Sequence, residues 1–314
     1  MERVLDPARI EAFAERAIAR IRLPDRGQAF SRRAARLRQL SAAERAGEGG
    51  AIGDYLRLMA VLADAQQLAL ATFSTPRPDP GALKLARTHG MPAVHAASLT
   101  REASWRAGLG ELCSFVIDSG KIPEEVRDSC ARLRDAPVAR LEAQADALLA
   151  GRGAEVDAAA APFLMSALQV YWLNLAARLA PEEVTPLEIP GVCPVCGTLP
   201  VASVVRVDRG SNGNRYLHCA LCATEWHMVR ITCSHCQETT GLTYYSVEGG
   251  SPAVQAESCR SCRGYRKILY QERDGGVEPI ADDLASLALD LLMSAEGYHR
   301  LSNSPLLWLK VAVP

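Results

Sequence analysis

Apolar residues recur with the roughly 3.6-residue spacing of amphipathic helices through the first half of the chain, between breaks rich in Gly and Pro. A first helix is predicted from Asp6, with Ile10, Phe13, Ala17 and Ile21 on its apolar side. No strand is clearly indicated in this part, so we predict an all-α domain over residues 1–185. Further helices are predicted over Phe30–Leu40, Ile52–Phe73, Leu83–Arg87, Arg101–Ile117, Glu124–Leu133, Val138–Leu149 and Phe163–Leu179.

Two segments bear on location. Ala158–Ala177 carries no charge and reaches the length of a membrane span, but it contains Gln169 and Asn174, so we predict a buried core helix instead. Ser31–Arg33 resembles the start of a twin-arginine export signal, but charged residues from Arg36 onward occupy the place of the apolar region. We predict an exposed helix face there, and a soluble, cytoplasmic protein without a membrane span.

The composition changes after Pro181 from Ala and Leu to Val, Thr, Tyr and Cys, which indicates a domain boundary near residue 186. Runs of β-branched and aromatic residues predict strands over Val201–Val207, Leu242–Val247 and Tyr265–Gln271. The spacing predicts one amphipathic helix over Asp282–Glu296. Its inward-facing residues are predicted to be Leu284, Leu287, Leu291 and Leu292.

Eight of the ten cysteines form four Cys-x-x-Cys pairs, and the last two pairs repeat the first two at an offset of 40 residues. In each copy 22 residues separate the pairs, enough for a hairpin that returns the second pair to the first. We therefore predict two tetrahedral four-thiolate sites in ribbons of the zinc or rubredoxin type, over residues 186–230 and 231–275, with a C-terminal helix and tail over 276–314. The predicted ligands are Cys193, Cys196, Cys219 and Cys222 for one ion, and Cys233, Cys236, Cys259 and Cys262 for the other.

Disulfides are the alternative interpretation of these cysteines. A disulfide framework is typical of small secreted domains, whereas this chain has 314 residues, a long helical half and no apolar signal segment at its start. Metal binding is favoured, and four thiolates can hold either zinc or iron. The other two cysteines, Cys113 and Cys130, lie in helical sequence and are predicted to be buried small residues.

Composition and motifs exclude several classes of function. The net charge of −1 gives no general attraction to nucleic acid or to an anionic membrane. The sequence contains no phosphate-binding loop, complete dinucleotide fingerprint, His-Glu-x-x-His motif or Gly-x-Ser-x-Gly elbow. Since four cysteines per ion leave no open coordination position, we predict that the protein is not an enzyme.

Some polar residues near the ribbons have two interpretations. Histidines His218, His227 and His235 could each replace a cysteine ligand, although a complete cysteine set makes this unnecessary. The basic and aromatic run from Arg260 to Tyr270 could bind nucleic acid, but it is short and is better interpreted as a solvated rim.

Three acidic residues of the predicted C-terminal helix are candidates for partner binding. Asp282 and Asp283 fit the start of a helix, where acids complement the dipole, and Asp290 could pair with an arginine or contact a partner.

The run from Leu217 to His227, with Arg230 and the Cys233–Cys236 pair after it, resembles the core of the formate dehydrogenase accessory protein family, FdhE. The Cys193–Gly197 knuckle, the helix around Gln169 and the stretch from Ala281 to Tyr298 resemble that family too, so that the similarity covers the whole chain. The α+β fold expected here, an all-α domain followed by two rubredoxin-like modules, agrees with it.

The resemblance implies a cytoplasmic, non-catalytic maturation factor that binds the catalytic subunit of a respiratory formate dehydrogenase, with two metal ions that are iron, zinc being the alternative. We expect the client surface to lie between the helical domain and the ribbons. Trp226 there has two equal interpretations, an exposed anchor for the client or a side chain packed between the knuckles. The competing hypotheses are a zinc-ribbon nucleic-acid-binding protein and a rubredoxin-like electron carrier, and a homodimer stays open. Residues predicted to contact the partner are Thr224, Glu225, Trp226, Arg230, Asp282, Asp283 and Asp290.

Overall fold

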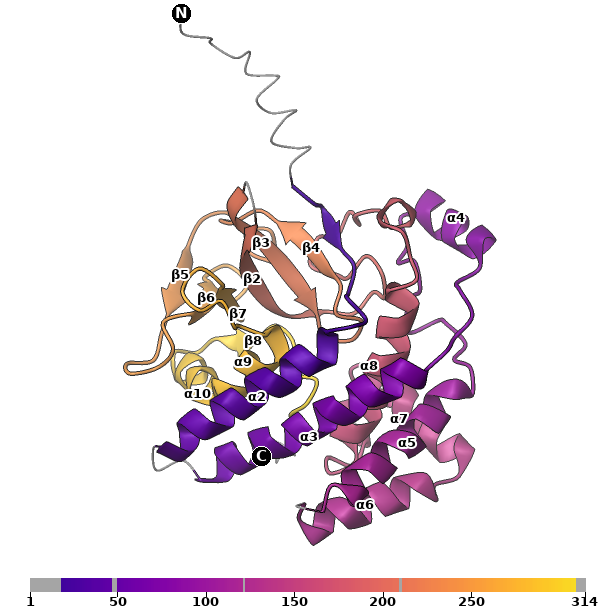
Figure 1. The fold of residues 1–314 in the computed structure, drawn as a ribbon. Coiled ribbons are helices and arrows are strands. Elements are labelled where there is room, and N and C mark those ends of the chain that lie inside the picture. The colour runs from indigo at the N-terminus through magenta and orange to yellow at the C-terminus, as the bar shows by residue number, and fades with distance from the viewer. Residues whose placement is uncertain (1–17, 47–49, 121, 209–210, 309–314) are drawn as a thin grey trace, which may run out of the picture.

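The computed structural model describes residues 18–46, 50–120, 122–208 and 211–308, which form a group of helices packed beside a mixed β-sheet (Figure 1). The helices predicted from Phe30 onward are all present, most with ends within a few residues of the predicted ones. They are α2 (Ala29–Ala46), α3 (Gly50–Thr72), α4 (Pro80–Thr88), α5 (Ser104–Asp118), α6 (Glu124–Arg134), α7 (Val138–Leu149) and α8 (Ala161–Ala176), with short 3-10 turns at Gly153–Glu155 and Pro181–Glu183.

Helix α8 is the central element of the helical part. Every one of its 16 residues is buried, which confirms the prediction of a core helix for this uncharged segment. Two of its polar residues have partners: Asn174 donates a hydrogen bond to Thr75 Oγ1 at 2.6 Å, and the Gln169 side chain donates to Ala220 O at 2.7 Å. Within the described ranges, no helix combines the length and hydropathy that crossing a bilayer requires.

The predicted first helix falls mostly outside the described residues, and its last position is wrong. Ile21 lies in strand β1 (Ile21–Arg22), which pairs with β4 (Glu225–Met228). His227 N also donates to Arg20 O at 2.9 Å. The N-terminal segment therefore adds a strand to the C-terminal sheet, because the free edge of β4 offers backbone partners that a local helix pattern cannot reveal.

The sheet joins the two ribbons. Its strand order is β1-β4-β3-β2-β7-β6-β5, with β8 beside β7. The parallel pairing of β2 with β7, Ser203 opposite Ile268, makes one sheet of both repeats. The three predicted strands are found as β2, β5 and β7. The bounds of the remaining strands of the sheet are β2 (Pro200–Asp208), β3 (Ser211–Cys219), β5 (Leu242–Tyr245), β6 (Val254–Cys259), β7 (Gly264–Tyr270) and β8 (His299–Arg300).

The predicted C-terminal helix is two helices, α9 (Pro279–Ala285) and α10 (Leu287–Ala295). The break lies at Ser286, with φ −108° and ψ 42°. Lys267 of β7 donates to the carbonyl oxygens of Asp283 and Ser286 at 2.7 and 3.1 Å, which satisfies the end of α9. The change of direction leaves Leu291 73% exposed, so its predicted inward position is wrong.

The arginines of α2 correct part of a second expectation. Arg32 and Arg38 are exposed as predicted, but Arg33 and Arg36 are buried. Arg33 Nε lies 3.1 Å from Glu278 Oε1, and an Arg36 nitrogen lies 2.6 Å from Asp282 Oδ1. Both acids belong to the start of α9, more than 240 residues away in sequence, and this distance is why the pattern within α2 misleads.

Candidate metal centres

The structure brings together the four cysteines of the first repeat, as the spacing predicts. Their sulfur atoms all lie within 4.8 Å of one another. Cys193 Sγ is 3.6 Å from Cys222 Sγ, and Cys196 Sγ is 3.3 Å from Cys219 Sγ. A tetrahedral ion with metal–sulfur bonds of roughly 2.3 Å separates its sulfurs by about 3.8 Å, so small movements would fit this group around an ion.

The second repeat has the same arrangement. The sulfurs of Cys233, Cys236, Cys259 and Cys262 form the other group of possible metal ligands. Cys233 Sγ lies 3.8 Å from Cys262 Sγ, and Cys236 Sγ lies 3.6 Å from Cys259 Sγ. The chain therefore has two four-cysteine groups that could bind two metal ions.

Each Cys-x-x-Cys turn ends in a residue with left-handed backbone. These φ angles are 77° at Gly197, 59° at Ala223, 62° at Gln237 and 56° at Arg263. The conformation turns the chain so that backbone N–H groups face the sulfur: the amides of Leu221 and Cys222 each lie 3.3 Å from Cys219 Sγ. Such donors stabilise the negative charge of a thiolate ligand.

The pKa values of the thiols in the first group are shifted in different directions. Burial raises the pKa of Cys193 and of Cys222 well above their usual range. Burial also opposes ionisation of Cys219, but hydrogen bonds from the other three thiols hold its pKa well below the usual range. A metal ion would favour the thiolate form at all four positions, and binding would release protons.

The helical part of the protein encloses the first group. Backbone amides of Ala93, Val94 and Ala96 donate to the carbonyl oxygens of Pro194, Val195 and Cys196 at 3.1, 2.7 and 2.8 Å. In α8, Trp172 Nε1 donates to Val94 O at 3.1 Å and Gln169 Nε2 donates to Ala220 O at 2.7 Å. No motif marks the loop at Val94 as a contact of the knuckle, whereas the polar Gln169 in an uncharged helix is a signal that could have indicated the contact of α8.

Of the two interpretations of Trp226, the structure agrees with the packed side chain and not with the exposed anchor. Thr224, Glu225 and Trp226 are all buried, with Trp226 5% exposed and its indole N–H donating to Pro190 O at 2.7 Å. Glu225 forms an ion pair with Arg206, and its carboxylate lies 3.1 Å from His218 Nδ1. The side chains of Glu225 and Trp226 thus hold β4 in the sheet through their contacts with Arg206, His218 and Pro190.

The three predicted acids also have partners within the chain. Asp282 pairs with Arg36, and Asp283 pairs with Arg300 and Lys267. Asp290 lies 2.7 Å from Lys267 Nζ and 3.0 Å from an Arg300 nitrogen, and it accepts a hydrogen bond from Tyr265.

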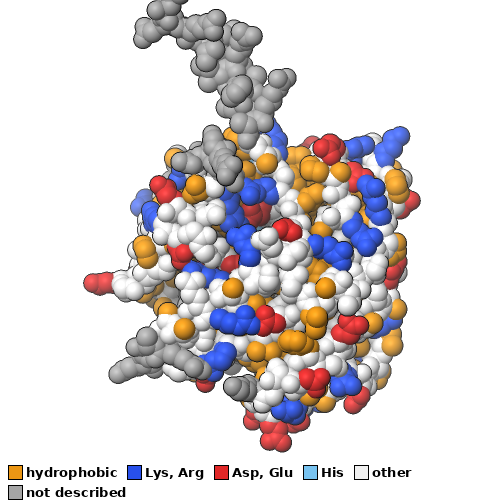
Figure 2. Space-filling model, in the orientation of Figure 1, with side chains coloured by type: hydrophobic (Ala, Val, Ile, Leu, Met, Phe, Trp, Pro, Cys, Tyr) orange, Lys and Arg blue, Asp and Glu red, His pale blue; other side chains and the backbone are white. Residues whose placement is uncertain are grey.

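The histidines and the basic run take structural positions. Neither group of possible metal ligands found among the described residues contains a histidine. Arg260 and Arg263 are exposed, as a solvated rim requires, but Arg266 and Lys267 are 3% and 1% exposed, so the second half of the run is not part of that rim. Figure 2 shows Lys and Arg side chains interspersed with acidic and hydrophobic ones over the visible face. Cys113 and Cys130 are buried, as predicted.

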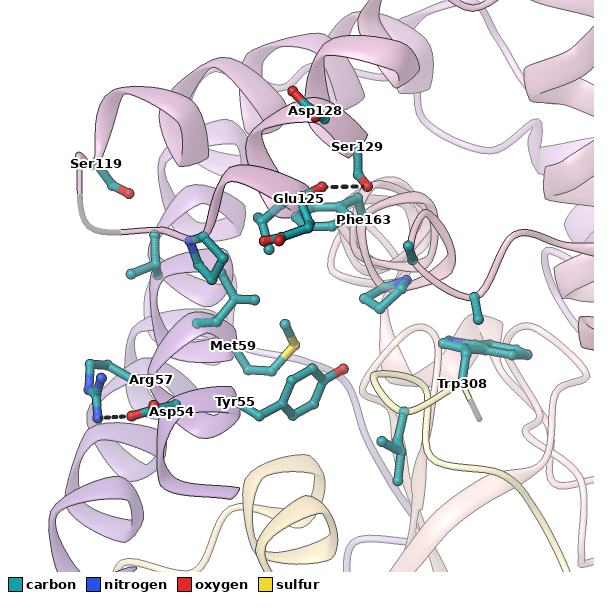
Figure 3. A pocket seen from close by; sticks show the side chains of 18 of the residues that line it. Asp54, Tyr55, Arg57, Met59, Ser119, Glu125, Asp128, Ser129, Phe163 and Trp308 are labelled. Atoms are coloured by element: carbon teal, nitrogen blue, oxygen red, sulfur yellow. Dashed lines mark hydrogen bonds and ion pairs between the residues drawn. The ribbon is translucent and has the colours of Figure 1, made fainter. Parts of the chain in front are cut away.

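A separate pocket of about 1060 Å³ lies among α3, α6, the start of α8 and the chain near Trp308 (Figure 3). Tyr55 and Met59 of α3 and Phe163 of α8 line it together with Trp308, and its described lining contains no cysteine. It is therefore distinct from both four-cysteine groups.

Comparisons with known proteins agree over most of the chain, from residue 18 to residue 307. Three family descriptions match consecutive parts of the chain: "FdhE, N-terminal" at residues 18–188, "FdhE, central domain" at 192–230 and "FdhE, C-terminal domain" at 231–307. A protein named "Protein FdhE homolog" from Edwardsiella ictaluri is 41% identical over 292 residues, which are 93% of this chain and 92% of that protein. A protein of the same name from Cronobacter sakazakii is 40% identical over 283 residues, 89% of this chain and 88% of that protein. The crystal structure of the FdhE protein from Pseudomonas aeruginosa is similar with a TM-score of 0.79 and 38% sequence identity, and the match covers 92% of this chain and 98% of that one.

Proposed function

Since this chain belongs to the FdhE family, we propose that it is a cytoplasmic maturation factor for a respiratory formate dehydrogenase. It binds the catalytic subunit of that enzyme and is required for the activity of the enzyme. The observation that carries the proposal is the match of FdhE descriptions to both the helical part and the ribbons, in one order along the chain.

We propose that each four-cysteine group holds one iron ion, with all eight thiolates as ligands. The fit of the sulfur separations to a tetrahedron and the backbone donors of the knuckles support this ligand set. Bound iron would cross-link the two knuckles of its ribbon and supply a centre that can change oxidation state. Ligation of this kind also contributes to folding, since the hairpins of a ribbon alone bury little apolar surface.

The protein would act without turning over a substrate of its own. Four thiolates complete the tetrahedron around each ion, which leaves no position for a substrate or an activated water. This chemistry suits a binding protein whose metals hold a surface in shape.

Of the residues predicted from sequence to contact the client, Arg230 is the one that stands exposed beside exposed apolar neighbours. Val229 and Ile231 are 63% and 66% exposed, and all three lie in the linker between the two ribbons. An exposed cation between two apolar side chains can bury both kinds of surface against a partner. We propose that this linker contacts the catalytic subunit.

The test combines genetics with capture. In a strain that lacks this protein, formate dehydrogenase activity should be lost, and the wild-type chain should restore it and retain the catalytic subunit during purification. The double substitution Val229→Asp and Ile231→Asp should weaken capture, whereas Leu291→Asp, which changes an equally exposed residue of α10, should not.

Full activity in the deletion strain, together with no retained subunit, would refute the maturation role. Undiminished capture by the Val229→Asp and Ile231→Asp variant would refute the proposed surface alone.

A further inference from the structure

The two four-cysteine groups differ in their access to solvent. Cys193, Cys196, Cys219 and Cys222 each have 0% of their surface exposed. In the second group Cys233 and Cys259 are buried, but Cys262 is half-buried and Cys236 is exposed. Two repeats with the same spacing thus place their sulfurs in different surroundings.

The cover of the first group comes from outside its ribbon. The loop around Val94 pairs with the knuckle at Cys196 through backbone hydrogen bonds, and α8 lies behind that loop. A cavity of about 500 Å³ borders Cys196, but the cysteine itself has no exposed surface, and the Thr198 hydroxyl is 3.1 Å from its sulfur. The second group is covered on other sides: His299 N donates to Arg263 O at 3.0 Å beside Cys262, and Gly191 packs against the backbone of Ser234. Neither contact covers Cys236, which stays exposed.

Hydroxyl groups also distinguish the two repeats. Thr198 Oγ1 lies 3.1 and 3.2 Å from the sulfurs of Cys196 and Cys219, and Thr224 Oγ1 lies 3.2 Å from Cys222 Sγ. Forty residues later the corresponding positions are Glu238 and Gly264.

These two residues bring no hydroxyl to the second group. The Glu238 carboxylate accepts hydrogen bonds from Thr239 and Thr240 in its own turn. Gly264 has no side chain, and a Cβ there would collide with Leu301. Within the part of the chain that the structure describes, the sulfurs of the second group have no hydroxyl at the positions of Thr198 and Thr224, whose hydroxyls could stabilise a thiolate in the first.

We infer that the second four-cysteine group is a site of ligand exchange, at which an external thiol can take the place of Cys236 on the metal. With a metal ion bound there, Cys233, Cys259 and Cys262 would remain its ligands. The incoming thiol would take the fourth ligand position and pass its proton to the sulfur of Cys236, which leaves as a free thiol. No oxidant or reductant is needed. The first group is closed to the same reaction because an incoming thiol would have to open the contacts of the Val94 loop and α8. This inference rests on the proposed metal occupancy and is independent of the identity of the client.

The first experiment uses the full chain loaded with two zinc ions and mixed with an excess of a chromophoric chelator and a small monothiol. Half of the zinc should leave in a fast phase whose rate rises in proportion to the thiol concentration. The other half should leave at least about tenfold more slowly and independently of thiol, because release from a buried site needs local opening of the fold. Labelling with iodoacetamide should modify Cys236 first, as read by mass spectrometry.

A second experiment tests Cys236 by chemical rescue. The variant Cys236→Ala should bind one zinc ion alone and two in the presence of the monothiol, which supplies the missing fourth sulfur. The matched variant Cys196→Ala should gain no ion from thiol, because its vacancy is buried. The same measurement with a folded protein that carries an exposed thiol tests whether a protein thiol can also supply the fourth sulfur. Rescue by the monothiol or by the protein thiol supports the inference.

Three results would overturn it: release of both ions in one phase, a fast phase that does not depend on thiol, or equal rescue of the two cysteine variants. None of them bears on whether the chain captures a formate dehydrogenase subunit. In a second check, the pair Thr198→Val and Thr224→Val should accelerate the slow phase and leave the fast one unchanged.

Discussion

Replacing Arg36 by Met should destabilise the protein strongly, because it removes the cation that faces a buried carboxylate. Arg36 is 5% exposed and Asp282 is 2% exposed, and their side chains approach to 2.6 Å. Burial raises the pKa of Asp282, while the hydrogen bonds and charge of Arg36 act in the opposite direction. Loss of one partner of a buried pair costs about 3–5 kcal/mol, and we expect a free energy of unfolding lower by that amount near neutral pH.

The pH dependence gives the sign of the effect. The pKa of Asp282 is already raised in the folded wild type, and in the Arg36→Met variant it should rise further above the unfolded value. Such a group favours folding at pH values below its unfolded pKa, and this contribution is lost as pH rises through the folded pKa. The difference between wild type and variant should therefore shrink as pH falls from about 7.5 towards the ordinary range of aspartate.

The assay is urea unfolding of the metal-loaded protein, followed by circular dichroism at several pH values. Arg38→Met is the matched control on the same helix: Arg38 and Asp64 form a pair with side chains 53% and 33% exposed, and its loss should cost at most about 1 kcal/mol. The double variant Arg36→Met and Asp282→Asn should recover about half of the loss, because no charge is left buried. Equal effects of the two arginine substitutions, or a loss that grows as pH falls, would refute the reasoning.

Two further predictions concern the core and the sheet. Leu168→Ala, at a position of α8 with 0% exposure, should lower the free energy of unfolding by about 2–5 kcal/mol. The control Leu85→Ala, at a position of α4 that is 61% exposed, should change it by less than about 0.5 kcal/mol. Similar melting temperatures for the two variants would contradict the central role of α8. Although burial opposes it, Arg206 and His218 hold the pKa of Glu225 well below its ordinary value of 4.5. The wild type should therefore lose stability relative to Glu225→Gln as pH falls below that value, and urea titrations that show a constant difference would count against this ion pair.

The helices and both cysteine groups could be predicted from the sequence because their causes are local. The period of apolar residues specifies the buried side of a helix such as α8, and two residues between cysteines suffice to form a knuckle. The repeat at 40 residues determined which pairs of cysteines meet, since the hairpin within each copy is the shortest connection.

What the sequence alone could not provide depends on residues far apart in the chain. The neighbouring residues in the sequence allow Arg36 and Trp226 to be exposed. Both are buried, because Arg36 pairs with Asp282 and Trp226 donates a hydrogen bond to Pro190 O, and both partners are distant in sequence. The same holds for the metal centres: equal spacing predicts equal sites, but the loop at Val94 covers only the first. Spacing specifies which ligands gather around an ion, whereas their access to solvent is decided by the elements that pack against them, and only the tertiary structure brings those elements together.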